Sequence, residues 1–558
     1  MQIVIPMSGF GERFRAAGYT LPKPLIEVEG KPIIQHVVEM FSDEDDFIFI
    51  CNEDHLSNHK YRMREILKSI SPSGRIVSIK SHKLGPIYAV MLALDEINLQ
   101  KATIVNYCDF TCYWDYIHFK DFAKRVDADG IIPSYRGFHP HTLWSNYYAY
   151  IKEGGYRAFD IQEKQPFTNK PREEFASSGT YYFKTGALMQ KYFQRCMDEG
   201  LMVSDEYYVS MSYKPMMQDG LRVYVYELQH FMQWGTPSDL NEYQYWSDIF
   251  HNISNCNELP KHNGMLLLPM AGLGSRFKKE GYKIQKPLIS VSGLPMAVQA
   301  MNDLPNTDIQ RYIVREDLED LEDLEGLDEL IDVLTKLSKE PSFEILDHAT
   351  DGQATTCIEG ASGLDMDATV TIAACDNGMI YDANKFNDLI LEQDVDVIVW
   401  GAKGYPGAMR NPEMYGWIDV DDTTNEINHV SVKKPLKNPG EDLIVVGAFT
   451  FKKLKYFFDA VKRMKDRKGL VNGEYYIDTA INDAIELGYK CKAFEINNYI
   501  CWGTPNDLKT FEYWQSCFHK WESHPYNLEY DANIPKDRVK ELKDKYEHIT
   551  PKKHQVAS

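Results

Sequence analysis

The chain has 558 residues, of which 44% are hydrophobic and 26% charged, a composition typical of a globular protein with more than one domain. Its formal net charge of −21 argues against nucleic acid or an anionic membrane surface as the main partner. The chain has no apolar run of about 18 residues and no basic flank before its first apolar residues, so we expect neither a membrane span nor a signal peptide. Ten cysteines without Cys-x-x-Cys spacing predict buried, reduced thiols and a cytoplasmic enzyme.

The first 32 residues have the pattern of a phosphate-binding loop. The short apolar run Ile3–Ile5 predicts a buried parallel strand, and Gly9 and Gly11 follow it. Glycines let the backbone turn tightly and bring its N–H groups close to a ligand. A strand, a glycine loop and a helix N-terminus in this order form an anion-binding site. Arg13 and Lys23 add positive charge beside this loop.

Helices and strands are then expected to alternate, as in an α/β fold. The predicted helices cover Ile33–Phe41, Lys60–Ser69 and a segment ending near Ile97, and the predicted strands cover Phe47–Cys51, Arg75–Ile79, Thr103–Phe110, a run ending at Ile132, and Ser177–Phe183.

Several polar residues follow these strands. Asp109 ends an apolar strand, and a carboxylate at that end of a parallel strand points into the crevice where open α/β sheets bind ligands. Gly85 and Pro86 fit a turn that offers backbone groups to a nucleobase, or an ordinary turn between a strand and a helix. His139 and His141 suggest a metal site or, in the absence of further ligands at suitable spacing, loop residues near a second substrate.

The whole pattern occurs twice. Met270-Ala-Gly-Leu-Gly-Ser-Arg-Phe277 repeats the glycine loop, Lys286 repeats Lys23, and Asp376 repeats Asp109. The offset between matching positions ranges from 263, between Pro6 and Pro269, to 269, between Lys164 and Lys433. We therefore expect both halves to have the same fold.

This repeated motif, Pro-Met-[Ser/Ala]-Gly-x-Gly-x-Arg-Phe followed by Lys-Pro-Leu-Ile, resembles the signature of the sugar-nucleotide pyrophosphorylase superfamily. The resemblance covers nearly the whole chain, once per half, and is strongest for the bacterial branch found among capsule and lipopolysaccharide biosynthesis genes. It implies two tandem Rossmann-like (GT-A-like), mixed-sheet nucleotidyltransferase domains. It also implies a cytoplasmic nucleotidyltransferase (EC 2.7.7.-) that joins an NTP to a sugar 1-phosphate or a similar phosphorylated acceptor, releases pyrophosphate and uses Mg²⁺.

The resemblance assigns roles to matching residues in both halves. The implied roles are catalysis for Arg13, Lys23, Arg276 and Lys286; Mg²⁺ binding for Asp109 and Asp376; nucleotide binding for Met7, Ser8, Gly9, Gly11, Gly85, Pro86, Met270, Ala271, Gly272, Gly274, Gly352 and Gln353; and acceptor binding for Glu163, Lys164, Gly179, Glu206, Lys433, Gly447 and Glu474.

Two departures from the family pattern bear on these roles. Many members carry a second metal-binding aspartate two residues before a Gly-Thr-Pro segment, and here Gln233 and Cys501 stand in its place. Val432 replaces Glu163 in the second half, which predicts the loss of a carboxylate and a different acceptor. Lys434 beside it favours an acceptor with an extra anionic group, or else points to solvent.

The base and the activity of each half stay open at this point. The Gln353 amide suits a pyrimidine edge, which slightly favours a pyrimidine NTP, but the same amide pairs with purines. The alternatives are a nucleotide-sugar glycosyltransferase, disfavoured because no Asp-x-Asp is present, and a chain with one catalytic and one regulatory NTP-binding half. The predicted organisation is domain 1 over 1–250, a linker over 251–263, domain 2 over 264–523 and a C-terminal surface helix and tail over 524–558.

Overall fold

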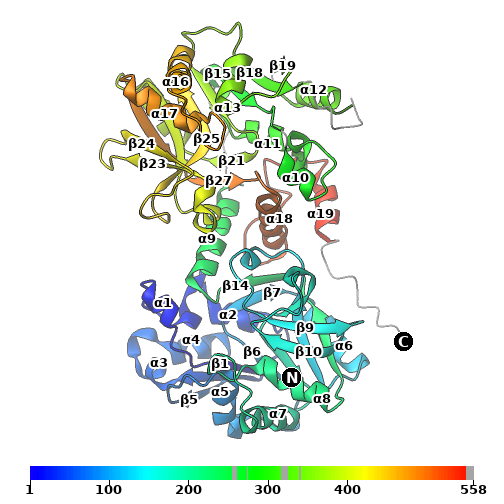
Figure 1. Cartoon of the computed structure of the whole chain (residues 1–558). Helices are drawn as coiled ribbons and strands as arrows, with labels where there is room; N and C mark the ends of the chain where they lie inside the picture. Colours follow the sequence, from blue (N-terminus) through cyan, green and yellow to red (C-terminus); the bar gives the residue numbers. More distant parts are fainter. Residues whose placement is uncertain (254–260, 273, 316–324, 339–340, 548–558) are drawn as a thin grey trace. The chain divides into compact units, whose positions relative to one another are not determined.

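The computed structural model describes residues 1–253, 261–272, 274–315, 325–338 and 341–547. Contacts within the chain divide it into two compact units (Figure 1). Unit 1 comprises Met1–Gln244, Lys520–His524 and the chain from Asp544, and unit 2 comprises Tyr245–His519 and Pro525–Lys543. Both units combine helices with a mixed sheet, which confirms the predicted α/β class.

Unit 1 is built on a ten-stranded sheet whose centre is buried on both faces. Strands β5, β4, β1 and β6 are parallel neighbours, as the continuous apolar runs predict. Strand β12 is antiparallel to both β6 and β8, β13 is parallel to β8, and β10, β9 and β11 extend the sheet. The strands are β1 (Gln2–Met7), β4 (Phe47–Asn52), β5 (Arg75–Ile79), β6 (Thr103–Asn106), β8 (Gly130–Tyr135), β9 (Ala149–Gly154), β10 (Arg157–Glu163), β11 (Phe175–Ser177), β12 (Thr180–Phe183) and β13 (Val223–Glu227).

The core of unit 1 joins these strands to α5, α7 and α8, which Figure 1 shows together beside the sheet. Ile87 and Val90 of α5 and Met189 and Phe193 of α7 are fully buried there. The helices of unit 1 are α1 (Glu12–Ala16), α2 (Ile33–Glu39), α3 (Glu53–Ser57), α4 (Met63–Ile70), α5 (Pro86–Leu92), α6 (Tyr116–Arg125), α7 (Gly186–Asp198) and α8 (Tyr213–Gln218).

Unit 2 repeats the order and the directions of the seven central strands. The order β19-β18-β15-β20-β25-β22-β26 corresponds to β5-β4-β1-β6-β12-β8-β13, with the same parallel and antiparallel pairs. Its strands are β15 (Lys261–Pro269), β18 (Asn306–Arg315), β19 (Pro341–Leu346), β20 (Val370–Ala373), β22 (Val397–Ala402), β23 (Gly416–Val420), β24 (Ile427–Val432), β25 (Leu443–Phe451) and β26 (Cys491–Glu495).

Helices α13, α16 and α17 form the core of unit 2 with this sheet, as α5, α7 and α8 do in unit 1. The helices of unit 2 are α10 (Ser275–Lys279), α11 (Met296–Asn302), α12 (Glu325–Leu337), α13 (Gln353–Gly360), α14 (Ala383–Leu391), α15 (Pro406–Arg410), α16 (Leu454–Asp466) and α17 (Ile477–Glu486), with α18 (Pro505–Lys520) near its end.

Each unit also carries two short antiparallel pairs. One pair follows the glycine loop and the other flanks the strand-end aspartate. These strands are β2 (Glu27–Val28), β3 (Lys31–Pro32), β7 (Phe110–Tyr113) and β14 (His230–Gln233) in unit 1, and β16 (Ser290–Val291), β17 (Leu294–Pro295), β21 (Asn377–Ile380) and β27 (Asn498–Cys501) in unit 2.

Two predicted strands are interrupted in the structure. The run expected over Thr103–Phe110 ends at Asn106, and Asp109 lies in the turn before β7. The run expected over Ser177–Phe183 is split between β11 and β12 at Ser178 and Gly179, where Gly179 takes a φ of 97°. In both cases a continuous apolar pattern concealed a sharp change of direction.

The connecting regions are partly outside the described residues. Helix α9 (Pro237–Ile253) runs into the predicted linker, β15 starts at Lys261, and residues 254–260 are not described. The sequence also has an acidic run from Arg315 to Asp332 with near-helical spacing; its residues 316–324 lie outside the described residues, and α12 covers the run from Glu325 onward. Residues 548–558 of the tail are not described, and the helix in the tail is α19 (Val539–Glu547). Its Val539, Leu542 and Tyr546 side chains are buried, so its apolar face is packed rather than exposed at the surface.

The nine cysteines among the described residues are buried free thiols, as predicted. Within the same residues no helix has the length and apolar character needed to cross a membrane.

The turn before α5 is held by backbone contacts with a distant segment. Tyr207 N donates to the Leu84 carbonyl at 3.0 Å, and Ile87 N donates to the Tyr207 carbonyl at 3.1 Å. Gly85 lies between these bonds with φ 86° and ψ 179°, a conformation nearly restricted to glycine. A Cβ at this position would meet the Tyr207 backbone nitrogen at 2.8 Å. The glycine therefore has a packing role whether or not a base lies on the turn.

We expect Gly85→Ala to destabilise unit 1 by about 3 kcal/mol, from backbone strain together with the contact with Tyr207. Gly137→Ala is the control, because Gly137 also has a φ of 86° but a Cβ there would meet nothing within 4 Å. That change is expected to cost about 1 kcal/mol. Chemical denaturation of the whole chain measures both, and equal losses would contradict the contact.

Candidate active site

A cavity of about 850 Å³ opens in unit 1 at the ends of β1, β6 and β10. All thirteen residues that the sequence placed in the first site line it, namely Met7, Ser8, Gly9, Gly11, Arg13, Lys23, Gly85, Pro86, Asp109, Glu163, Lys164, Gly179 and Glu206. The structure brings these residues together from positions as far apart as 7 and 206. Their individual roles remain predictions.

The glycine loop joins β1 to α1 on one wall of the cavity. Gly11 has a φ of 64° and immediately precedes α1, a conformation that costs other residues about 1–2 kcal/mol. A Cβ on Gly9 would meet no atom within 4 Å, so this residue faces open space. In unit 2, Gly274 has a φ of 59° before α10, and Gly272 is similarly open. Both loops therefore leave room beside bare backbone.

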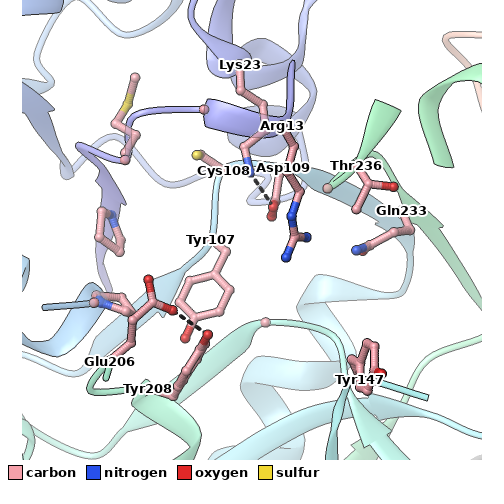
Figure 2. Close-up of a pocket in the computed structure, with 18 of the residues that line it drawn as sticks. Arg13, Lys23, Tyr107, Cys108, Asp109, Tyr147, Glu206, Tyr208, Gln233 and Thr236 are labelled. Atoms are coloured by element: carbon pink, nitrogen blue, oxygen red, sulfur yellow. Dashed lines mark hydrogen bonds and ion pairs between the residues drawn. The ribbon is translucent and has the colours of Figure 1, made fainter. Parts of the chain in front are cut away.

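Lys23 and Asp109 form an ion pair at the edge of the cavity (Figure 2). Lys23 begins a short 3₁₀ helix, Lys23–Leu25, and its Nζ donates to Asp109 Oδ2 at 2.8 Å. Burial lowers the pKa of Lys23, but the Asp109 carboxylate outweighs it, so the net pKa is raised and the lysine stays charged. Lys286 Nζ and Asp376 Oδ2 repeat the pair at 2.5 Å in unit 2.

The turn that carries Asp109 is fixed by the β7–β14 hairpin. Trp234 N donates to the Asp109 carbonyl at 2.9 Å, and Gln233 lies opposite Phe110 in the hairpin. A Cβ on Gly235 would lie 2.6 Å from Gln233 Nε2 and 3.2 Å from Asp109 Oδ2. The glycine thus keeps the space beside the carboxylate free.

The surroundings of the Asp109 carboxylate fit a divalent cation that has few protein ligands. Mg²⁺ binds through one or two carboxylates and takes its other ligands from phosphate and water. Asp109 offers one such oxygen, and the space next to Gly235 admits further ligands. Gln233 reaches this space in the place of a second aspartate, and Figure 2 shows its amide directed into the cavity with the Arg13 guanidinium.

A second group of charged residues lies on the other side of the cavity. Lys164 has a φ of 60°, and its Nζ donates to the Tyr208 hydroxyl at 2.8 Å, while Tyr208 donates to Glu206. Ser210 Oγ donates to Glu163 Oε2 at 2.5 Å. Burial raises the pKa of Glu163, although Ser210 and Lys164 oppose this shift. The arrangement offers one cation flanked by two carboxylates.

Several lining residues were not predicted from the sequence. Tyrosines supply much of the wall, from four separate segments: Tyr107, Tyr147, Tyr148, Tyr181 and Tyr208. Asp239, in the first turn of α9, also lines the cavity and accepts from Thr236 Oγ1 at 2.6 Å. The only signal for these residues in the sequence was its high tyrosine content, which does not distinguish tyrosines that line a cavity from tyrosines in the core.

The histidines His139 and His141 do not line this cavity. Both are buried, at 3% and 6% exposure, and His141 Nε2 lies 2.9 Å from the Tyr135 hydroxyl. Burial lowers the pKa of His139 to about 3, so it is neutral at physiological pH. The pair packs with Tyr135 and with Phe231, which lines the cavity, so the histidines lie behind the cavity wall, and the expectation of a metal site or of loop residues near a second substrate stays a prediction.

The predicted residues of unit 2 occupy matching positions on its elements. Arg276 lies in α10, Lys286 begins a 3₁₀ helix, Gln353 begins α13, and Gly447 lies in β25. Gly352 approaches the Tyr475 backbone as Gly85 approaches Tyr207, and a Cβ on Gly352 would lie 2.5 Å from Tyr475 N. The remaining predicted positions are Met270 and Ala271 beside the glycine loop, Lys433 after β24, and Glu474 before α17.

Comparison with known proteins supports the nucleotidyltransferase superfamily for the first part of the chain. Residues 3–251 match the family model described as nucleotidyl transferase. Two curated relatives are 30% identical: the bifunctional protein GlmU of Methanocaldococcus jannaschii over 99 residues, and the mannose-1-phosphate guanyltransferase of Schizosaccharomyces pombe over 141 residues. These alignments take in 18% and 24% of this chain, and they span 22% and 37% of the relatives' lengths.

Among solved structures, a nucleoside-diphosphate-sugar pyrophosphorylase of Vibrio cholerae RC9 aligns with 20% identity and a TM-score of 0.35. The alignment covers 43% of this chain and 99% of that one.

Asp239 generates a prediction about pH. Burial raises the pKa of this carboxyl to about 6, above its usual value of 3.8, with Thr236 opposing the shift. The unfolded chain then ionises first, so stability is lost as the pH rises from about 4 to about 6. Asp239→Asn should remove this loss and stabilise the protein above pH 6.5 by about 1–3 kcal/mol.

Denaturation midpoints from pH 5 to 8 measure this effect. Asp95→Asn, an exposed position in the same unit, is the control and should leave the pH profile unchanged. If the denaturation midpoint changes with pH in the same way for the wild type and for Asp239→Asn, the burial of an unfavourable charge at Asp239 is contradicted.

Proposed function

We propose that unit 1 is a Mg²⁺-dependent nucleotidyltransferase, which joins an NTP to a sugar 1-phosphate or similar phosphorylated acceptor and releases pyrophosphate. The observation that carries the proposal is the cavity itself. It combines an open glycine loop and the cations Arg13 and Lys23 with Asp109 on one side, and Lys164 between two carboxylates on the other. Such a cavity suits two phosphate-bearing substrates that meet in its middle.

The chemistry needs positioning and charge neutralisation rather than a covalent intermediate. An oxygen of the acceptor phosphate attacks the α-phosphorus of the NTP, and the bond to pyrophosphate breaks. In this proposal Lys23 would hold the α-phosphate as charge develops, and Arg13 would stabilise the leaving pyrophosphate. Lys164 would hold the acceptor phosphate against repulsion from the triphosphate. Asp109 would hold Mg²⁺, which would add positive charge beside the phosphates.

The charges of Lys23 and Asp109 neutralise each other at the edge of the cavity, where both side chains are 22–23% exposed. A phosphate competes for the lysine, and a cation competes for the aspartate. Binding of the metal and the nucleotide together therefore satisfies both groups, whereas binding of either alone leaves one charge without its partner. We expect the two to bind in a mutually dependent way.

We extend the proposal to unit 2, which would make the chain bifunctional. The support is the same strand order and the same loop, lysine and aspartate, with Lys286 and Asp376 in contact. The proposal also includes a preference for a pyrimidine NTP, different acceptors for the two units and a place in surface polysaccharide precursor synthesis. A glycosyltransferase is the weaker candidate, because no second carboxylate lies two residues from either aspartate: Tyr107 and Thr111 flank Asp109, and Ala374 and Gly378 flank Asp376.

Asp109→Asn and Asp376→Asn in the whole chain test the proposal. Each change should abolish pyrophosphate release in its own unit, by at least about 100-fold, because the cation ligand is lost. The double variant should be inactive. Asp95→Asn and Asp388→Asn, two exposed aspartates in the corresponding units, are the controls and should keep full activity.

The assay combines each NTP with a panel of phosphorylated acceptors in the presence of Mg²⁺. If the unchanged protein releases no pyrophosphate with any pair of NTP and acceptor, the proposal is wrong. If only Asp109→Asn loses activity, unit 2 is regulatory rather than catalytic. If only Asp376→Asn loses activity, unit 1 is the regulatory one.

A further inference from the structure

The two units differ at three positions that lie together beside Lys164 in unit 1 and Lys433 in unit 2. Each of these lysines follows an antiparallel strand pair, β9–β10 or β23–β24. In unit 1, Ala149 and Glu163 lie opposite each other on β9 and β10, and Ser210 donates to the Glu163 carboxylate. Ala149 and Glu163 both line the cavity. The carboxylate thus comes from the strand, and a small hydroxyl faces it.

The matching positions in unit 2 have exchanged these properties. Gly416 and Val432 lie opposite each other on β23 and β24, as Ala149 and Glu163 do. Asp478, the second residue of α17, stands at the position of Ser210, since both are two residues after the second tyrosine of the Glu-Tyr-Tyr segment. The strand now carries the small apolar group, and the helix carries the carboxylate.

The geometry links the changes at Gly416 and Asp478 in unit 2. A Cβ on Gly416 would lie 2.6 Å from Asp478 Oδ2, so with the alanine of unit 1 this carboxylate would have to move. Val432 packs against the core of unit 2, so the strand residue that matches Glu163 brings no carboxylate. The Asp478 carboxylate and the Lys433 ammonium also influence each other: Asp478 raises the pKa of Lys433, against the larger effect of burial.

We propose that Asp478 is the carboxylate with which unit 2 recognises its phosphorylated acceptor, in the place that Glu163 has in unit 1. The proposal rests on the proposed function of unit 2. Lys433 takes the phosphate, and Asp478 accepts a hydrogen bond from a hydroxyl or an ammonium group of the same molecule. The substrate class is a small phosphate ester with such a donor near its phosphate.

This assignment replaces two expectations from the sequence. Val432 does not remove the carboxylate from the site, because Asp478 restores it from a different element. Lys434 is exposed, and its carbonyl accepts from Ser431 Oγ at 2.7 Å, so it does not argue for an extra anionic group on the acceptor. The two units read the same kind of donor from different directions, which separates their acceptors by shape rather than by charge.

The experiment uses the whole chain with Asp109→Asn, so that only unit 2 turns over. Asp478→Asn is expected to raise the KM for the acceptor at least ten-fold and to leave the KM for the NTP unchanged. Asp419→Asn on β23 is the matched control, because this aspartate pairs with His429 away from Lys433, and it should change neither constant. An unchanged acceptor KM in Asp478→Asn overturns the inference while the proposed function stands.

A rescue distinguishes recognition from a merely structural role. Asp478→Ser should weaken acceptor binding as Asp478→Asn does. The triple change Gly416→Ala, Val432→Glu and Asp478→Ser should give unit 2 the acceptor preference of unit 1, with a KM for that acceptor within about three-fold of the value in unit 1. Failure of the rescue in a folded triple variant, checked by circular dichroism, counts against the inference.

If the unchanged protein releases no pyrophosphate with any pair, the proposed function fails, and calorimetry decides the inference on its own. Glucose 1-phosphate, phosphoethanolamine and 2-phosphoglycolate, which has a carboxylate and no hydroxyl or ammonium donor, are the probes. Binding of either of the first two that Asp478→Asn weakens ten-fold supports the inference. Equal binding by the variant, preference for 2-phosphoglycolate, or no binding of any probe overturns it.

Discussion

The contact between a lysine and the aspartate at a strand end organises both units. Lys23 is held in a short 3₁₀ helix between two prolines, and Asp109 in a turn clamped by the β7–β14 hairpin, so two rigid segments meet at one ion pair. A site for two polyanionic substrates must gather cations, and gathered cations repel one another without an anion among them. The aspartate supplies that anion, and in the proposed function it would also be a ligand for a divalent cation. Unit 2 has the same ion pair and the same hairpin.

Much of this arrangement could be predicted from the sequence, because its parts depend on local backbone chemistry. Gly11 precedes a helix in the left-handed region, and Pro22 and Pro24 hold Lys23, so each leaves a recognisable pattern. Internal repetition then distinguished these patterns from chance turns. The same reasoning placed Asp109 in the site although it extended the strand four residues too far.

What could not be predicted depends on contacts between distant segments. His139 and His141 look like ligands in the sequence, yet Tyr135 and Phe231 enclose them. Asp478 looks like an ordinary first-turn acid of a helix, and only the position of Gly416 shows that its carboxylate lies beside β23. Pairwise comparison of the repeats along the sequence aligned Val432 with Glu163 and predicted that a charge was lost. In the structure the Asp478 carboxylate lies beside Gly416, which is opposite Val432, and this contact is the basis for inferring that the charge moved to another element.

The backbone hydrogen bonds of Leu84 and Ile87 with Tyr207 have a consequence for how the two proposed substrates bind. The turn at Gly85 belongs to the side of the cavity assigned to the nucleotide, and Tyr207 stands between Glu206 and Tyr208 on the side assigned to the acceptor. A substrate that fixes one segment thereby restrains the other, since two main-chain hydrogen bonds join them, and the entropy of ordering both is lost only once. Whichever substrate binds first therefore prepares the pocket of the other, and in the proposed function the two substrates bind with positive cooperativity in either order.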